Sequence, residues 1–588
     1  MFILFTDLLA LLIPWILRMA IDDIRYRPQS ANLLTYAALL LTVACLQGIF
    51  RFYMRKLLVG ISRQIEYSIR TDFFAHIQRI HSSFFTNTRT GSIMALATND
   101  LDAVRNFLGP GILNLFNTVF VFVSTLAVMF SINVKLSLYS MIAIPILPLL
   151  VSKLSSMLYI RFRASQEQYA ALSARTQESI AGIKVVKSFT RQDQEKEVFS
   201  GLNQEYIQRN MSLAKIRSAF WPAMIFIGGV GTMVVLLVGG RQVIGQTLTL
   251  GQFVQFSAYI GSITWPLISL GWVINLVQRG SVSMKRINRV LNIKPKIKTS
   301  SHPVKINRIK GNIEFRQVYF KYENEQGYDD YIKENIMDSK LLSARPNDQW
   351  VLQDINFALK ERMQVAIVGF TGSAKSSLLN LIVRLYDPQK GQILLDGHDI
   401  KKIDLEQLRT SIGYVTQEPF LFSKSIRENI LFGLSQRSKM PPGQLDQLVE
   451  ESARTASLHQ EIMGFEKKYD TVIGERGITL SGGQKQRLAI ARALAADPSI
   501  LILDDSFSSI DTHTEELILA NLKARTRSIT AIIVSHRIST IKDSDLILVM
   551  DEGRIVERGT HLSLLKSCGI YQKLYYRQQL SEELEEEI

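Results

Sequence analysis

The sequence predicts a protein in two parts: an all-α domain of six membrane-spanning helices, followed by a cytosolic α/β domain with a largely parallel sheet. Three observations predict this fold class. Six apolar runs lie in the first half of the 588 residues, and the basic excess is confined to that half. The second half alternates short β-branched runs with helical stretches. Apolar residues make up 47% of the chain, which excludes a disordered protein.

Five runs are apolar enough to cross a bilayer, which takes about 20 residues. They lie near residues 33–50, 111–131, 136–152, 219–240 and 252–275. A sixth run, near residues 2–20, contains Asp7 and Pro14 and is also predicted to be a span. A signal peptide is the alternative for this run, but the run has no basic start and no small-residue cleavage site. We therefore place a transmembrane domain at residues 1–290 and a linker at residues 291–310.

The basic residues predict how this domain is oriented. Residues 1–290 hold 28 Lys and Arg against 13 Asp and Glu, so they carry the whole net charge of +15. Most of these basic residues lie in two long connections, at about 51–105 and 161–217, and basic loops stay on the cytoplasmic side. Both connections are polar and poor in Gly and Pro, which predicts long helical extensions into the cytoplasm. A nucleic-acid partner is not expected, since such proteins cluster basic residues without long apolar runs.

Residues 311–588 are predicted to form the α/β domain, interrupted by a polar surface loop at 323–349 and ending in an acidic helix end at 582–588. Its predicted strands are Val365–Val368, Ile393–Leu395, Ile500–Leu503, Ala531–Val534 and Leu546–Val549. With only two cysteines, Cys45 and Cys568, a disulfide scaffold is excluded. Both cysteines are expected to be buried as small apolar residues.

A glycine-containing loop follows the strand Val365–Val368 and precedes an apolar helix, which is the order of a P-loop. The loop residues are Gly369, Phe370, Thr371, Gly372, Ser373, Ala374, Lys375, Ser376 and Ser377. Their backbone N–H groups are expected to bind phosphate, with Lys375 at the terminal phosphates and Ser376 on Mg²⁺. A chance glycine turn is the alternative. Ala374 stands where the pattern has glycine, and a Cβ costs about 1–2 kcal/mol wherever φ is positive.

A second acidic element supports phosphate chemistry. The apolar strand Ile500–Leu503 ends in Asp504 and Asp505. Asp504 is placed to hold the Mg²⁺ shell. Asp505 is placed to orient or deprotonate an attacking water.

Residues Leu480–Gln484, with the helix that follows, resemble the signature motif of ABC ATPases. The resemblance implies that Ser481, Gly482, Gly483 and Gln484 bind ATP held by a partner chain. Four further elements match in order. Tyr322 resembles the A-loop aromatic that stacks on adenine. Gln417 resembles the Q-loop glutamine that senses the γ-phosphate and contacts the membrane domain, and it is also expected to bind Mg²⁺. Residues 508–511 resemble the D-loop, and His536 resembles the switch histidine. Gly474–Gly477 is similar to the loop before the signature in exporters.

Six spans before one nucleotide-binding domain resemble a half-size ABC exporter of type I, with ATP and Mg²⁺ as cofactors. Residues 89–100 and 176–184 are similar to the intracellular loops of exporters. Residues 265–272 and 278–281 resemble the A-type half of the multidrug-resistance-like heterodimeric exporters. The first span starts later than in that family, which a mis-assigned start codon or a truncation would explain.

The resemblance also implies an asymmetric dimer. Asp505 stands where the active family member has glutamate, so this chain's own site is expected to bind ATP and hydrolyse it slowly. A rearranged site in which Asp505 is a competent base is the alternative. The intact signature is expected to serve a faster site on a second half-transporter. A heterodimer is favoured, with a homodimer as the alternative.

The cargo is predicted to be hydrophobic or amphiphilic, since the spans contain few charges. Drugs, lipids and peptides stay open, and so do a lipid flippase and an ATP-binding regulatory half without its own transport. The protein is expected in the bacterial inner membrane, in contact with lipid, with its nucleotide-binding domain in the cytoplasm.

Overall fold

The computed structural model describes residues 1–27, 29, 32–141, 146–322, 349–434, 440–474, 479–526 and 529–586. These residues form two compact units, Met1–Gln78 with Thr90–Ile293, and Arg79–Arg89 with Lys294–Ile588. The segment Arg79–Arg89, which contains helix α3 (Ser82–Asn87), thus belongs to the C-terminal unit, although the chain on both sides of it lies in the first unit. Most of the predicted insertion at 323–349 lies outside the described residues.

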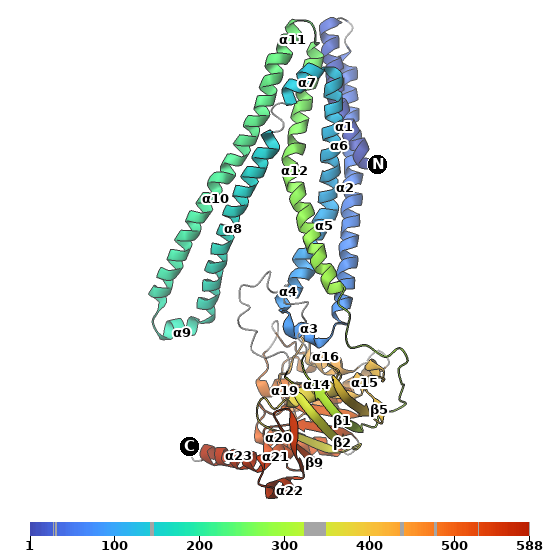
Figure 1. Cartoon of the computed structure of the whole chain (residues 1–588), viewed down its shortest axis with the longest axis vertical. Helices are drawn as coiled ribbons and strands as arrows, with labels where there is room; N and C mark the ends of the chain where they lie inside the picture. The colour runs from blue at the N-terminus through green and yellow to red at the C-terminus, as the bar shows by residue number, and fades with distance from the viewer. Residues whose placement is uncertain are drawn as a thin grey trace. The chain divides into compact units, whose positions relative to one another are not determined.

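The first unit is built from helices of very different lengths (Figure 1). They are α1 (Phe2–Tyr26), α2 (Leu33–Ile77), α4 (Thr90–Ala95), α5 (Leu101–Asn106), α6 (Ile112–Ile132), α7 (Val134–Met141), α8 (Ile146–Ala181), α9 (Ile183–Ser188), α10 (Gln192–Val234), α11 (Gly240–Ile244) and α12 (Leu250–Leu291). Single π-helical turns continue the helix at Leu96–Asp100, Phe107–Gly111 and Val235–Gly239. Helix α1 packs on α2 and α12, α12 packs on α6, and α8 runs beside α10.

Three helical stretches in the described part of the chain are long and apolar enough to cross a membrane: Phe2–Tyr26, Leu33–Ile77 and Thr90–Ile132. The first three predicted spans lie within them. The predicted span at 136–152 is divided between α7 and α8, and residues 142–145 lie outside the description. The predicted spans at 219–240 and 252–275 fall on α10–α11 and on α12, and all six boundaries stay predictions.

The predicted helical extensions are present. Helix α2 continues without a break to Ile77, and α8 to Ala181. Helix α10 begins at Gln192, so the connection at 161–217 is helical over most of its length. A polar sequence that is free of Gly and Pro clusters therefore propagates the helix of the apolar segment beside it.

The prediction for the cysteines was wrong, because both are exposed. Cys45 lies in the apolar stretch of α2, where side chains can face outward toward lipid without being covered by protein. Cys568 lies in the turn between α22 (His561–Lys566) and α23 (Ile570–Glu586), with φ at 53°. Residue type alone predicted burial, but position on a helix surface or in a turn decided it.

The C-terminal unit contains two sheets. The larger has the order β10-β9-β3-β8-β7-β6, with parallel pairing except at β10 (Arg554–Gly559). Its other strands are β9 (Leu546–Asp551), β3 (Gln364–Val368), β8 (Thr530–Val534), β7 (Ile500–Asp504) and β6 (Ile412–Val415). The predicted parallel sheet is confirmed for four of the five predicted strands.

The fifth predicted strand, Ile393–Leu395, lies in the other sheet, so its assignment to the parallel sheet was wrong. That sheet is antiparallel, with the order β2-β1-β4-β5. Its strands are β1 (Ile313–Phe320), β2 (Leu352–Leu359), β4 (Lys390–Leu395) and β5 (His398–Asp399). An apolar run predicts a strand, but its partner follows from long-range pairing, here Ile393 with Phe315.

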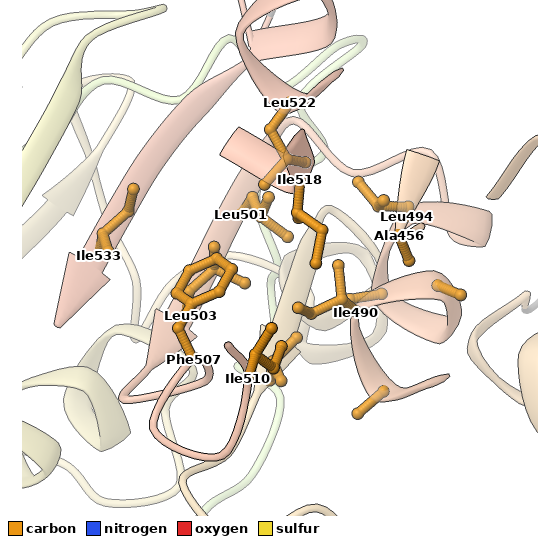
Figure 2. Close-up of a cluster of buried hydrophobic side chains, with 14 of the residues drawn as sticks. Ala456, Ile490, Leu494, Leu501, Leu503, Phe507, Ile510, Ile518, Leu522 and Ile533 are labelled. Carbon is orange, nitrogen blue, oxygen red and sulfur yellow. The ribbon is translucent and has the colours of Figure 1, made fainter. Parts of the chain in front are cut away.

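The C-terminal unit also contains helices, some of which pack on the parallel sheet and others on neighbouring helices. They are α14 (Lys375–Ile382), α15 (Leu405–Thr410), α16 (Ile426–Ile430), α17 (Pro442–Thr455), α18 (His459–Met463), α19 (Gly482–Ala495), α20 (Thr512–Thr526) and α21 (Ile538–Ile541), followed by α22 and α23. Figure 2 shows the apolar cluster that joins β7 and β8 to α19 and α20. Leu501 and Leu503 of β7, Ile490 of α19 and Ile518 of α20 are fully buried in it. This core holds the loops at the strand ends in place.

Candidate nucleotide-binding site

Four of the predicted site segments begin at one edge of the parallel sheet. Strand register pairs Ile367 of β3 with Val534 of β8, Val534 with Asp504 of β7, and Leu503 with Val415 of β6. The P-loop, the segment with His536, Asp505 and the segment with Gln417 follow these strands directly. The carboxyl ends of adjacent parallel strands form a crevice where α/β proteins bind ligands.

The loop at 369–374 has the strained backbone of a phosphate-binding turn. Gly369 has φ at 153°, and a Cβ there would lie 2.1 Å from the carbonyl oxygen of Met550. Gly372 has φ at 90°. Ala374, which precedes α14, has φ at 71°, in the left-handed region. The predicted steric cost of a Cβ at this position, about 1–2 kcal/mol, therefore applies to Ala374 in this structure.

Lys375 is held at the centre of this loop. It is 8% exposed, and its Nζ donates to the carbonyl oxygens of Gly369 at 2.9 Å and Phe370 at 3.0 Å. Burial lowers the pKa of Lys375, and the nearby carboxylates of Asp505 and Asp504 act in the opposite direction. A cation and two acidic groups thus face the same small volume beside the loop.

Asp504 is nearly fully buried, at 3% exposure. Burial raises the pKa of its carboxyl group, while a hydrogen bond from Ser376 lowers it. A hydroxyl and a carboxylate at this position are hard oxygen ligands, which fit Mg²⁺. Bound there, Mg²⁺ would neutralise charge on the phosphates, with Ser376 and Asp504 as its protein ligands.

Tyr414 is a supporting residue that the sequence analysis missed. It lies on β6, close to the carboxylate of Asp504, and its hydroxyl donates to Asn380 Oδ1 at 3.3 Å. Burial and the charge of Asp504 raise the pKa of Tyr414. Its only sequence signal was its place three residues before Gln417, which does not reveal a partner on the next strand.

Asp505 is anchored through its backbone. Its N–H donates to the carbonyl oxygen of Val534 at 2.9 Å, and its φ is 45°. Aspartate tolerates this left-handed conformation better than most residues. The Cα of Asp505 is therefore tied to strand β8, and its carboxylate reaches only as far as one methylene allows.

Tyr322 lies beside the loop with one side open. Its hydroxyl and the Ser377 Oγ are 2.9 Å apart, and its ring makes edge contacts with Phe320 and Tyr386 at centroid distances of 4.8 and 5.2 Å. It remains 37% exposed. An aromatic ring held in this way, next to a phosphate loop, can stack on a nucleotide base.

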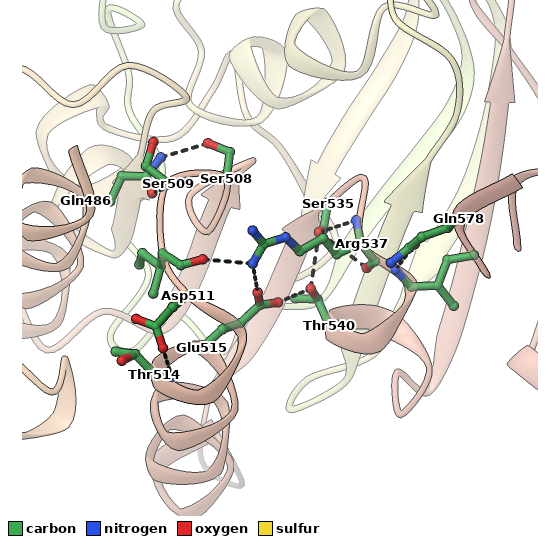
Figure 3. Close-up of polar contacts among 12 residues, drawn as sticks. Gln486, Ser508, Ser509, Asp511, Thr514, Glu515, Ser535, Arg537, Thr540 and Gln578 are labelled. Atoms are coloured by element: carbon green, nitrogen blue, oxygen red, sulfur yellow. Dashed lines mark hydrogen bonds and ion pairs between the residues drawn. The ribbon is translucent and has the colours of Figure 1, made fainter. Parts of the chain in front are cut away.

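His536 is exposed just beyond β8 and lies near enough to Asp504 to lower the pKa of that carboxyl group. The residues around it are fixed (Figure 3). Arg537 donates through Nη1 to the Ile510 carbonyl at 2.8 Å and to Glu515 Oε2 at 2.5 Å. Glu515 is 1% exposed and also accepts from Thr540. Sequence reasoning missed Glu515, since a carboxylate on an amphipathic helix normally indicates a solvated face.

The signature residues form the start of α19. Ser481 Oγ accepts from the N–H of Gln484 at 3.3 Å, and Gln484 Oε1 accepts from the N–H of Ser481 at 2.9 Å. A Cβ on Gly483 would lie 2.8 Å from the Ser509 carbonyl oxygen. The glycines therefore let the D-loop approach α19, in addition to any role toward a phosphate.

Gln486 joins the signature helix to the D-loop, and it too was missed. Its Nε2 donates to Ser508 Oγ at 2.9 Å, and its Oε1 accepts from the N–H of Ser509 at 3.0 Å (Figure 3). Among the described residues, no hydrogen bond or ion pair joins the signature to the P-loop. The fold thus brings together Tyr322, Lys375, Ser376, Asp504, Asp505 and His536 and leaves Ser481–Gln484 apart from them.

Two predicted elements are only partly placed. Gln417 is exposed two residues beyond β6, one strand from Asp504. In the exporter-like loop, Gly474 has φ at 101°, while residues 475–478 lie outside the described part of the chain.

Three features define an ATP-binding protein of the ABC class. They are a P-loop after β3, a buried aspartate at the end of β7, two strands away in the same sheet, and a helix that begins with a capped glycine motif. Residues 1–267 match the family described as "ABC transporter transmembrane region", and residues 352–508 match "ABC transporter". The chain belongs to the ABC transporters, as an exporter with both domains in one polypeptide. It is an ATPase coupled to transport, with a multi-pass membrane domain and a cytosolic nucleotide-binding domain.

Several known proteins are similar over almost their whole length. The Bacillus subtilis "Probable multidrug resistance ABC transporter ATP-binding/permease protein YheI" is 34% identical over 96% of this chain and 92% of its own length. The Escherichia coli "Multidrug resistance-like ATP-binding protein MdlA" is 34% identical, covering 95% and 89%. A solved bacterial Atm1-family ABC exporter with ATP bound matches with a TM-score of 0.76 and 26% identity, over 98% of this chain and 97% of that one.

Proposed function

We propose that this chain is one half of a dimeric exporter for hydrophobic or amphiphilic molecules, in which its own P-loop site is the slow ATP site. The signature Ser481–Gln484 then serves a faster site built on a partner that carries glutamate in place of Asp505. The named relatives support drug-like cargo, since YheI and MdlA are named as multidrug resistance proteins.

The observation that carries the slow-site proposal is the anchoring of Asp505. The hydrogen bond from its N–H to Val534 holds the backbone in place. Aspartate is shorter than glutamate by one methylene, about 1.5 Å. The fixed backbone cannot advance to close this gap, and a misplacement of about 1 Å can cost a hundredfold in rate.

The same site supports the individual roles proposed for its residues. Tyr322 stacks on adenine, residues 369–377 hold the phosphates, and Ser376, Asp504 and Gln417 hold Mg²⁺. Asp505 and His536 act on the attacking water and the γ-phosphate. ATP closes two nucleotide-binding domains against each other, and the segments near residues 85–95 and 184–192 carry that motion to the spans. The membership of Arg79–Arg89 in the C-terminal unit supports the first of these two segments.

Gentle isolation of the tagged chain from its native membrane tests the dimer. Recovery of an equimolar second half-transporter is the expected result, with glutamate after the aspartate that corresponds to Asp504. Changing that glutamate to glutamine is then expected to abolish most ATP hydrolysis, while Asp505→Asn changes it little. Recovery of this chain alone, with hydrolysis abolished by Asp505→Asn, would overturn the slow-site proposal.

A lipid flippase is the second candidate. An "ATP-dependent lipid A-core flippase" from Syntrophus aciditrophicus is 31% identical over 98% of this chain and 90% of its own length. ATP-dependent dye accumulation in inverted vesicles, compared with ATP-dependent lipid translocation in liposomes, separates the two cargoes. Failure of both with intact ATP binding would support a regulatory half instead.

A further inference from the structure

The C-terminal helix α23 lies against residues 535–538, the switch segment that contains His536. Tyr571 of α23 is fully buried, and a small cavity at the sheet edge is lined by Gly369, His536 and Tyr571, among others. One helix therefore lies close to both the P-loop and the switch histidine.

The start of α23 is fixed on two sides. The Tyr571 hydroxyl and His561 Nδ1 of α22 are 2.7 Å apart. The Glu557 carboxylate of β10 accepts from the N–H groups of Ile570 and Tyr571, the latter at 3.3 Å. Both contacts tie the first turn of α23 to neighbouring elements, so the helix is a rigid support.

Gln578 lies seven residues after Tyr571 and therefore on the same face of α23. Its Oε1 accepts a hydrogen bond from the N–H of Ile538 at 2.8 Å (Figure 3). Ile538 is the first residue of α21 and lies two residues after His536. A first-turn N–H has no partner within its own helix, so Gln578 satisfies it from 40 residues away along the chain.

The backbone around His536 is thereby held at three points. The N–H of Arg537 donates to Ser535 Oγ at 3.0 Å, the Arg537 side chain bonds Ile510 and Glu515, and the N–H of Ile538 bonds Gln578. The His536 side chain itself stays exposed. The loop is fixed while its imidazole remains free to meet a ligand.

We propose that Gln578 is a positioning residue for the switch histidine, so that the C-terminal helix sets how tightly this site retains ATP. This inference rests on the proposed ATP site. Gln578 does not reach the reacting atoms, and it acts through the backbone of Ile538. Without its hydrogen bond, His536 spends less time in the position that holds the γ-phosphate.

The test measures how fast Mg·ATP is released from the full-length transporter in nanodiscs, with any copurifying partner, after free nucleotide is removed. The proposed slow site suits this measurement, since trapped ATP persists there. His536→Ala, which removes the side chain of the switch histidine, is the reference variant. Gln578→Leu is expected to speed ATP release about fivefold or more. Gln578→Glu is expected to stay within about twofold of wild type, because it keeps a hydrogen-bond acceptor. Gln579→Leu, a change at the exposed neighbouring residue, is expected to have no effect.

Two further readouts separate positioning from a general structural role. ATP affinity without Mg²⁺ and the thermal midpoint are expected to be unchanged in Gln578→Leu. Equal losses in all three readouts would overturn the inference. So would wild-type release by Gln578→Leu alongside fast release by His536→Ala, a result that leaves the proposed function intact. Wild-type release by His536→Ala would overturn the switch role and this inference together.

If Gln578→Leu does not fold, Ile538→Pro removes the other partner of the same hydrogen bond. Proline is tolerated at the first helical position, and Arg537 before it has φ at −93° and ψ at 123°, which proline permits. Faster release with unchanged Mg²⁺-free affinity is again the expected result, and wild-type release would overturn the inference.

Discussion

The hydroxyl groups of Tyr322 and Ser377 lie 2.9 Å apart, so Tyr322, which follows β1, is tied to the first turn of the P-loop helix. This contact joins the segment after β1 of the antiparallel sheet to helix α14, which follows β3 of the parallel sheet. It holds an aromatic ring beside the phosphate loop while leaving the ring 37% exposed.

Tyr322→Phe is expected to keep most ATP affinity, because the ring that stacks on the base is retained. Tyr322→Ala is expected to weaken ATP binding by about 1–3 kcal/mol, the usual worth of one base–aromatic stack. Titration with a fluorescent ATP analogue measures both. Equal losses in the two variants would show that the hydroxyl, and not the ring, makes the contribution.

Ala374→Gly is expected to stabilise the nucleotide-binding domain. The φ of residue 374 is 71°, and the steric cost of a Cβ at this angle exceeds the entropic cost of a more flexible glycine backbone in the unfolded chain. The expected net gain in stability is about 0.5–1 kcal/mol. The same change at Ala520, an exposed position in α20, is expected to destabilise by a similar amount. Thermal unfolding of both variants tests the sign, and destabilisation by Ala374→Gly would contradict the strain.

Asp505→Glu is expected to raise the ATPase rate of this chain's own site at least about tenfold, since the added methylene brings the carboxylate toward the water. The left-handed backbone of Asp505 is expected to make the variant slightly less stable. Asp543→Glu, at an exposed position, is the matched control. Single-turnover hydrolysis with the partner's glutamate removed measures the effect, and an unchanged rate would favour Asp505 as a competent base.

Mg²⁺ binding is expected to be sensitive to pH through Asp504. Burial raises the pKa of this carboxyl group, so it keeps its proton to a pH above the ordinary aspartate value of 3.8. In the absence of Mg²⁺, the stability that the protonated form contributes is lost as pH rises through this raised pKa. Mg²⁺ needs the ionised form, so its stabilising effect is expected to grow over the same range.

Thermal shifts with and without Mg·ATP, measured from acid to neutral pH, test this. Asp504→Asn is expected to remove the pH dependence, since an amide does not titrate. If Mg²⁺ still stabilises Asp504→Asn with the pH profile of the wild type, a group other than Asp504 is responsible for the pH dependence.

Asp7 of α1 is buried at 3% exposure and accepts a hydrogen bond from Asn117 Nδ2 of α6 at 2.7 Å. Its other oxygen, Oδ2, has no hydrogen-bond partner among the described residues. Asp7→Asn is therefore expected to keep or raise stability, since it retains an acceptor and removes a carboxylate from an apolar setting.

Asp7→Leu is expected to cost about 1–3 kcal/mol, because it leaves the half-buried Asn117 side chain without this partner. Adding Asn117→Leu is expected to recover much of this loss. Thermal denaturation of the purified transporter measures these variants and Asn117→Leu alone. Additive losses in the double variant would mean that the two side chains do not act as a pair.

The sequence by itself predicted the helical domain, the α/β domain and the P-loop. Each of these depends on patterns within a short stretch: apolar runs, β-branched runs, or a glycine loop between a strand and a helix. The strain at Ala374 could also be anticipated, since a missing glycine in a known turn implies a positive φ. The resemblance of Ser481–Gln484 to the ABC signature then placed the chain in its family.

Only the tertiary structure decided which residues support those motifs. Tyr414 contacts Asp504 from a neighbouring strand, Glu515 bonds Arg537 across 22 residues, and Gln578 bonds Ile538 across 40. The partner of Ile393 was likewise decided by pairing with β1. Motifs are local because the chemistry needs fixed spacing along the backbone. Supporting contacts join segments that meet only when the sheet and its helices pack, and a polar side chain alone does not indicate its distant partner.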